Sequence, residues 1–172
     1  MLKLRSVPRP DKAIVNRLYE LAVSRSRNPD LYASMGAPDT VEGRFELLTT
    51  HIVILIERLD RAGDRGKAIG QALFDLYIRN LDGALREMGV GDLAVGKRMK
   101  GLGGLFYGRA AAYRRAFASG DIAELKAVIA RTILVERPEV SPEILASYVL
   151  NEKSALDRLG DGELLSEARD AA

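Results

Sequence analysis

Residues 39–62 read DTVEGRFELLTTHIVILIERLDRA, and this stretch decides the fold. Asp39 is followed three residues later by Glu42, a pattern close to the capping box that opens a helix. The run at residues 52–56 is apolar on every side of the expected helix, so this helix should be buried at the centre of the molecule. The sequence therefore predicts a central helix over residues 39–62, around which the other helices pack.

The rest of the chain shows apolar residues at helical spacing, and no run of alternating β-branched residues between turn signals. Further helices are expected at residues 11–26, 30–35, 67–88, 92–119, 121–135, 141–159 and 162–169. We therefore expect an all-α, single-domain bundle of about six to eight helices. The N-terminal helix (1–27) would belong to the same fold as the main domain (28–160), and residues 161–172 would form an acidic turn or tail.

The composition excludes several classes of protein. The 172 residues include no cysteine, which rules out a disulfide framework, a thiolate zinc site, an iron–sulfur cluster and a cysteine nucleophile. His51 is the only histidine, so a transition-metal site is not predicted. No serine sits in a nucleophile elbow and no carboxylate pair has acid–base spacing. We expect no enzyme activity, no metal and no cofactor.

One motif resembles a phosphate-binding loop but lacks an essential residue. Gly91 to Lys97 has the required glycine and lysine spacing, but Arg98 stands where a serine or threonine must hold magnesium. A nucleotide site is therefore not predicted.

Positive charge is concentrated in one segment. Residues 92–119 carry six basic side chains and one acidic side chain, whereas residues 138–172 carry three basic and eight acidic ones. The six basic residues are Lys97, Arg98, Lys100, Arg109, Arg114 and Arg115. They could form a solvated helix face, bind anionic lipid headgroups or bind RNA phosphates, and charge alone does not choose among these.

Small residues recur in the same segment. Gly104, Gly108 and Ala112 are four residues apart and so share one side of a helix. Each helical glycine costs about 0.5–1 kcal/mol relative to alanine, which indicates a steric demand. Two interpretations stay open: tight packing in the core, or a groove that receives a partner helix.

Several short sequences together resemble a known family. They are Met35 to Thr40, Gly43 to Phe45 with His51, Gln71 to Asp75, Arg86 to Asp92, Gly96 to Lys100, Phe106 to Arg109 and, more loosely, Tyr148-Val149. On these, residues 28–159 resemble the ubiquinol-cytochrome c chaperone domain, most closely its alphaproteobacterial form.

The resemblance implies an all-helical, non-enzymatic assembly factor that escorts newly made cytochrome b toward respiratory complex III. The expected partner is cytochrome b or another complex III subunit, with peripheral contact to an anionic membrane or a ribosome, and with neither DNA nor a small-molecule substrate. The N-terminus lacks the apolar core of a signal peptide. We therefore expect a bacterial protein in the cytoplasm or on the cytoplasmic face of the inner membrane.

Under this hypothesis the segment rich in glycine and basic residues binds the client. Gly104, Phe106, Tyr107 and Gly108 would form the groove, and Lys97, Arg98, Lys100 and Arg109 its charged rim. Replacing Gly108 with leucine should then abolish client binding while leaving the fold helical.

Two alternatives remain from the sequence. The first is a lipid- or quinone-binding protein with a pocket around His51, Phe74 and Tyr77. The second is an RNA- or ribosome-associated module, whose affinity should fall steeply as salt rises.

Overall fold

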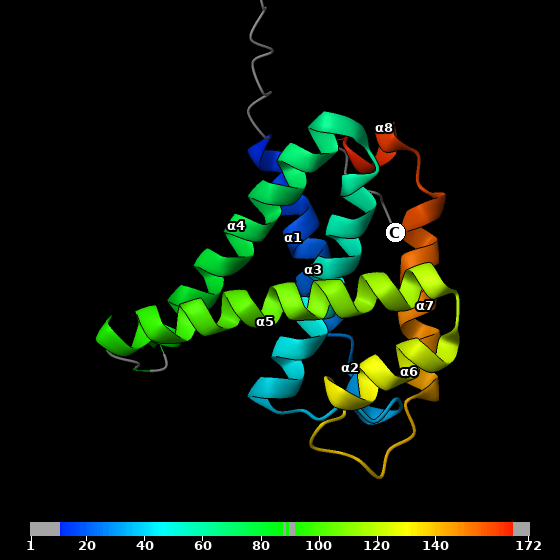
Figure 1. Ribbon diagram of the computed structural model, residues 1–172. Coiled ribbons are helices and arrows are strands. Elements are labelled where there is room, and N and C mark those ends of the chain that lie inside the picture. The colour runs from blue at the N-terminus through cyan, green and yellow to red at the C-terminus, as the bar shows by residue number, and fades with distance from the viewer. Residues whose placement is uncertain (1–10, 88, 90–91, 167–172) are drawn as a thin grey trace, which may run out of the picture.

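The computed structural model describes residues 11–87, 89 and 92–166, and the side chains of all of these except residues 92–98. The described residues form helices joined by turns, without a strand (Figure 1), which confirms the all-α prediction. In chain order the helices are α1 (Lys12–Ser26), α2 (Pro29–Ala33), α3 (Val41–Asp60), α4 (Gly63–Glu87), α5 (Asp92–Ser119), α6 (Ile122–Arg131), α7 (Glu143–Arg158) and α8 (Asp161–Leu164).

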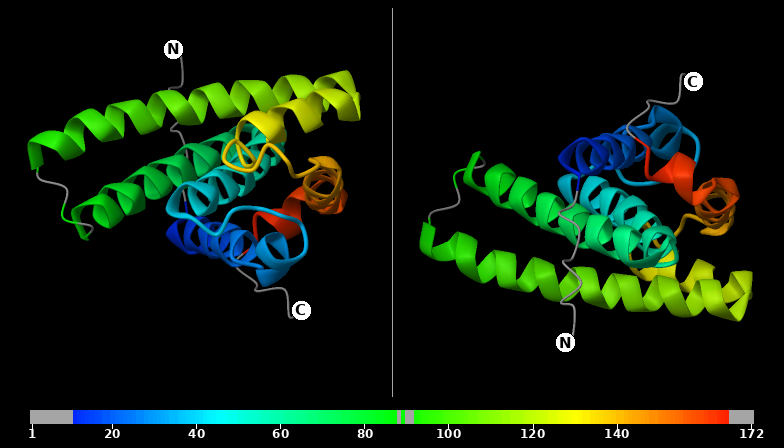
Figure 2. Two further views of the ribbon diagram at one scale, coloured as in Figure 1. Left: turned by 90° about the horizontal axis from the view of Figure 1, so that it is seen from below. Right: turned by 90° about the horizontal axis from the view of Figure 1, so that it is seen from above.

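Helix α3 is the centre of the bundle, as predicted. Ile52, Val53, Ile54 and Leu55 are each at most 2% exposed. The helix packs against α1, α4, α5 and α7, and these neighbours surround it in the views of Figure 2. The run that is apolar on every side thus lies where helices approach from several directions.

The ends of α3 differ from the prediction. The N-cap is Thr40, whose side chain accepts a hydrogen bond from the Gly43 amide at 3.1 Å, while Asp39 pairs with Arg44 at 2.6 Å. The predicted cap was therefore one residue too early. A break does separate this helix from the next, and Gly63, with a φ of 70°, lies at it, but α4 begins at Gly63 rather than at residue 67.

Helices α4 and α5 form a long hairpin. Figures 1 and 2 show α4 running away from the other helices and α5 returning beside it and across α3. Gly89, with a φ of 81°, follows the end of α4. The hairpin therefore projects one of its ends beyond the core.

The C-terminal helices close the other side. Helix α6 ends at Arg131 rather than near residue 135, because Thr132 adopts a ψ of −83° outside the helical region. Helix α7 begins at Glu143 rather than at residue 141, and the Ser141 hydroxyl lies 3.5 Å from the Glu143 amide. Helix α8 is shorter than predicted, and residues 167–169 of that prediction lie outside the described residues.

Arg58 connects the centre of the bundle to this end of the chain. Its side chain is 9% exposed and donates hydrogen bonds to the carbonyls of Leu156 and Leu159. It also pairs with Asp161 at 2.7 Å. Part of the acidic C-terminal segment is thus held against α3.

Candidate functional site

The structure does not assemble the pocket predicted around His51, Phe74 and Tyr77. His51 faces α7, where its Nε2 lies 3.2 Å from the Tyr148 hydroxyl. Tyr77 lies in the core and its hydroxyl shares a 2.7 Å hydrogen bond with Thr49. Thr49 and His51 are two positions apart on α3 and so point to different sides of the helix. The three side chains therefore do not line one cavity.

Burial of His51 makes the stability of the protein depend on pH. Burial, followed by the charge of Arg25, lowers the pKa of His51 from 6.5 to about 4. Between these values the unfolded chain binds a proton that the folded protein does not, so stability falls as pH falls. From about pH 6.5 to about pH 5 we expect a loss of about 1.5 kcal/mol from this group, measured by urea denaturation.

The control for this prediction is His51→Gln. The variant lacks the titrating ring, so its stability should change less over the same pH interval than that of the wild type. Equal losses in both proteins would show that other groups cause the acid sensitivity.

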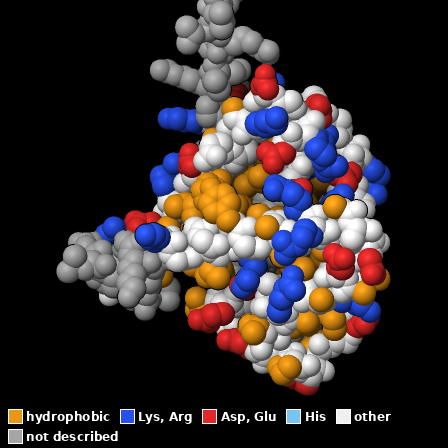
Figure 3. Space-filling view, viewed as in Figure 1, with side chains coloured by type: hydrophobic (Ala, Val, Ile, Leu, Met, Phe, Trp, Pro, Cys, Tyr) orange, Lys and Arg blue, Asp and Glu red, His pale blue; other side chains and the backbone are white. Residues whose placement is uncertain are grey.

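The aromatic residues predicted for the α5 groove have unequal exposure. Phe106 is only 4% exposed, and its ring lies 4.7 Å from that of Phe74 and 5.7 Å from that of Tyr77. Tyr107 is 62% exposed and contacts Phe74 from outside, with ring centroids 5.5 Å apart. Figure 3 shows a hydrophobic area between α4 and α5 on this face. Phe106 therefore anchors α5 to α4, while Tyr107 is available for an external contact.

The glycines that were predicted to form the client groove lie on the outer side of α5. Gly104 and Gly108 are exposed, and a Cβ at either position would meet no atom within 4 Å. Packing inside the core is thus the wrong explanation for these two residues. Ala112, the third member of the stripe, is 8% exposed and belongs to the core.

The predicted basic rim is not one surface. Arg109 donates to both carboxylate oxygens of Glu46, at 2.7 and 2.9 Å, so its side chain is engaged within the protein. Arg114 pairs with Glu57 at 2.6 Å. Lys100 is exposed, while Lys97 and Arg98 lie on α5 with side chains outside the described part.

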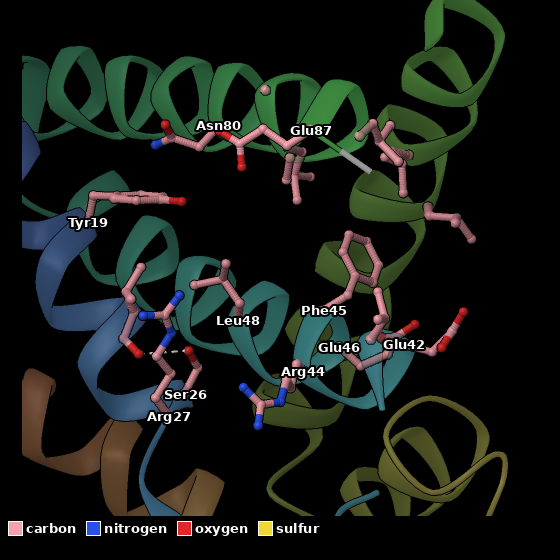
Figure 4. A pocket seen from close by; sticks show the side chains of 18 of the residues that line it. Tyr19, Ser26, Arg27, Glu42, Arg44, Phe45, Glu46, Leu48, Asn80 and Glu87 are labelled. Atoms are coloured by element: carbon pink, nitrogen blue, oxygen red, sulfur yellow. Dashed lines mark hydrogen bonds between the residues drawn. The ribbon is translucent and has the colours of Figure 1, made fainter. Parts of the chain in front are cut away.

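The structure forms a different site, a half-open groove of about 890 Å³ between α1, α3, α4 and α5 (Figure 4). Its apolar walls come from three helices. They are Phe45 and Leu48 of α3, Leu81, Ala84 and Leu85 of α4, and Leu102 and Leu105 of α5. Leu105 is 45% exposed, and Val41, which also lines the groove, is 60% exposed.

Sequence reasoning missed this groove. Leu81 and Leu85 lie at helical spacing on the apolar stripe of α4, and both are half-buried and line the groove. The groove exists because the end of α4 and the start of α5 project beyond the core. The apolar stripe was the available signal, but a stripe alone does not show whether a neighbouring helix covers it.

Polar groups in the groove lie mainly near its edges. Tyr19 and Asn80 face each other in Figure 4, and burial raises the pKa of the Tyr19 hydroxyl. Arg27 and Arg44 lie toward α1, and Glu42 lies on the opposite side. Among the described residues, no group of three or more histidine, aspartate or glutamate side chains could hold a metal ion. The groove is suited to an apolar ligand with polar ends.

Comparisons with known proteins identify the family. The family model described as ubiquinol-cytochrome C chaperone matches residues 33–169. The chain belongs to this family. Membership supports a chaperone role in assembly of complex III, and it implies a non-enzymatic protein.

A solved structure agrees with this assignment. The crystal structure of the Cbp3 homolog from Brucella abortus is 36% identical, covers 91% of this chain and 87% of its own, and superposes with a TM-score of 0.79. The comparison with curated proteins gives no significant match. The ubiquinol-cytochrome C chaperone assignment confirms the resemblance seen in the sequence.

None of the helices in the described part of the chain is long and apolar enough to span a membrane.

Proposed function

We propose that this ubiquinol-cytochrome C chaperone binds newly made cytochrome b and assists its assembly into the ubiquinol-cytochrome c reductase complex. The observation that carries the proposal is the apolar groove between α1, α3, α4 and α5. A membrane-protein client exposes apolar helical segments before it is assembled. A groove with leucine walls and polar edges can shield such a segment from water and release it without any covalent step.

The proposal is tested by co-purification from detergent-solubilised native membranes. Tagged wild-type protein should recover cytochrome b, identified by mass spectrometry. The Leu105→Glu variant should recover much less cytochrome b, because a carboxylate in the groove is costly to bury against an apolar client. Leu105 is 45% exposed, so this change should leave the fold intact.

Ile144→Glu is the matched control. Ile144 lies on α7 outside the groove and is 56% exposed. This variant should recover as much cytochrome b as the wild type. Absence of cytochrome b from the wild-type sample, or recovery of lipid or quinone in its place, would contradict the proposal.

A second contact site for the client on the outer surface of α5 stays a prediction. Lys100, Gly104, Tyr107 and Gly108 are all exposed there. Gly108→Leu has room in the folded protein, since a Cβ would meet nothing within 4 Å. If this surface contacts the client, Gly108→Leu should reduce cytochrome b recovery without loss of helical structure by circular dichroism. Normal recovery would assign client binding to the groove alone.

Contact with an anionic membrane or a ribosome also stays a prediction. It depends on Lys97, Arg98, Lys100 and the exposed Arg115, because Arg109 and Arg114 already form ion pairs with α3. A location on the cytoplasmic face of the inner membrane would follow from such contact.

A further inference from the structure

The groove is open to solvent on one side. Its volume of about 890 Å³ is bounded by apolar side chains of α3, α4 and α5. A helix that lies in it would bury one face against these walls and leave its opposite face exposed. The groove therefore contacts one apolar face of a helical segment.

The charges around the groove define the ends of that segment. Arg44 is engaged by Asp39, and Glu46 is engaged by Arg109. The other charged lining residues are Arg27, Glu42 and Glu87, and none of them forms an ion pair with a described side chain. In Figure 4, Arg27 lies on the α1 side, Glu42 lies across the groove from it, and Glu87 lies on the α4 wall. The rim is thus positive on one side and negative on the other.

We infer that the groove binds a helical client segment that is apolar on one face and carries an acidic side chain beside Arg27. A basic side chain would lie toward Glu42 and Glu87. The inference rests on the proposed function, because it names the part of the client that the same groove takes. Opposite charges at the rim would orient the segment, while the leucine walls supply the apolar contact.

The parts of α4 and α5 that form the groove wall can change their packing when a ligand binds. No side chain in residues 78–87 or 99–105 is fully buried. Segments with few buried apolar contacts open at low free-energy cost and gain protection when a ligand covers them. Occupation of the groove should therefore slow amide hydrogen exchange in these two segments.

Fluorescence anisotropy with two dye-labelled helical peptides tests the inference. Each peptide has about 12 residues and the same leucine face. One carries a glutamate near one end and a lysine near the other, and the second carries lysine near both ends. The wild type should bind the glutamate peptide about three- to tenfold more tightly. Arg27→Glu should reverse this preference, and Arg27→Gln should abolish it.

Arg65→Glu is the matched charge reversal, on an exposed arginine of α4 that does not line the groove. It should leave the preference unchanged. The inference is overturned if neither peptide binds, if the preference survives Arg27→Glu, or if hydrogen-exchange protection falls outside the α4–α5 wall. Cytochrome b that co-purifies while neither peptide binds would leave the proposed function standing without this inference. Peptides that bind as expected without cytochrome b recovery would show the reverse.

Discussion

Gly66→Ala is expected to lower the free energy of unfolding by about 2–3 kcal/mol, measured by urea denaturation. Gly66 lies in the first turn of α4, where that helix leaves the end of α3. A Cβ at this position would stand 2.2 Å from the Leu59 carbonyl oxygen and 2.7 Å from the Ala62 Cβ. The closer atom belongs to the backbone and cannot rotate away, so the turn between α3 and α4 would have to open.

Gly108→Ala and Gly104→Ala are the matched controls, with the opposite expected sign. Neither added Cβ meets an atom within 4 Å. Each change should raise stability by about 0.5–1 kcal/mol, because alanine loses less backbone entropy than glycine on forming a helix. A loss of stability in either variant would contradict the geometry of α5. A gain would show that folding does not require these glycines, which strengthens the case for an external contact there.

Much of the fold could be predicted because helix boundaries depend on neighbouring residues. Asp11 accepts a hydrogen bond from the Ala13 amide, and Asp121 accepts one from the Ala123 amide, so both caps were visible as local patterns. The start of α3 was placed wrongly because Asp39 and Thr40 are adjacent residues that both favour the cap position. Propensity alone does not choose between them.

The candidate site was less predictable, because it depends on contacts between distant parts of the chain. Arg109 was assigned to an exposed rim from its place in a basic cluster, but its partner, Glu46, lies 63 residues earlier. Periodicity placed Leu81 and Leu85 on the apolar stripe of α4, but it did not show that α4 and α5 project together from the core. The groove arises from the way α4 and α5 pack and project beyond the core. Neither sequence segment shows this by itself.

Arg109→Ala should lower the free energy of unfolding by about 2–3 kcal/mol, since it leaves a largely buried carboxylate without its partner. The Glu46 side chain is 12% exposed and that of Arg109 is 24% exposed. Two hydrogen bonds, at 2.7 and 2.9 Å, join the guanidinium to both carboxylate oxygens and connect α5 to α3. Chemical denaturation at neutral pH measures the loss.

Arg114→Ala provides the comparison that identifies burial as the cause. Arg114 pairs with Glu57 between the same two helices, but its side chain is 57% exposed, so its removal should cost less than about 1 kcal/mol. Arg109→Lys should recover only part of the loss, because an ammonium group cannot reproduce the paired geometry of a guanidinium. Equal, small losses for both alanine variants would show that Glu46 is well hydrated without Arg109. In that case Arg109 would again be a candidate for the charged rim, free to exchange Glu46 for a client carboxylate.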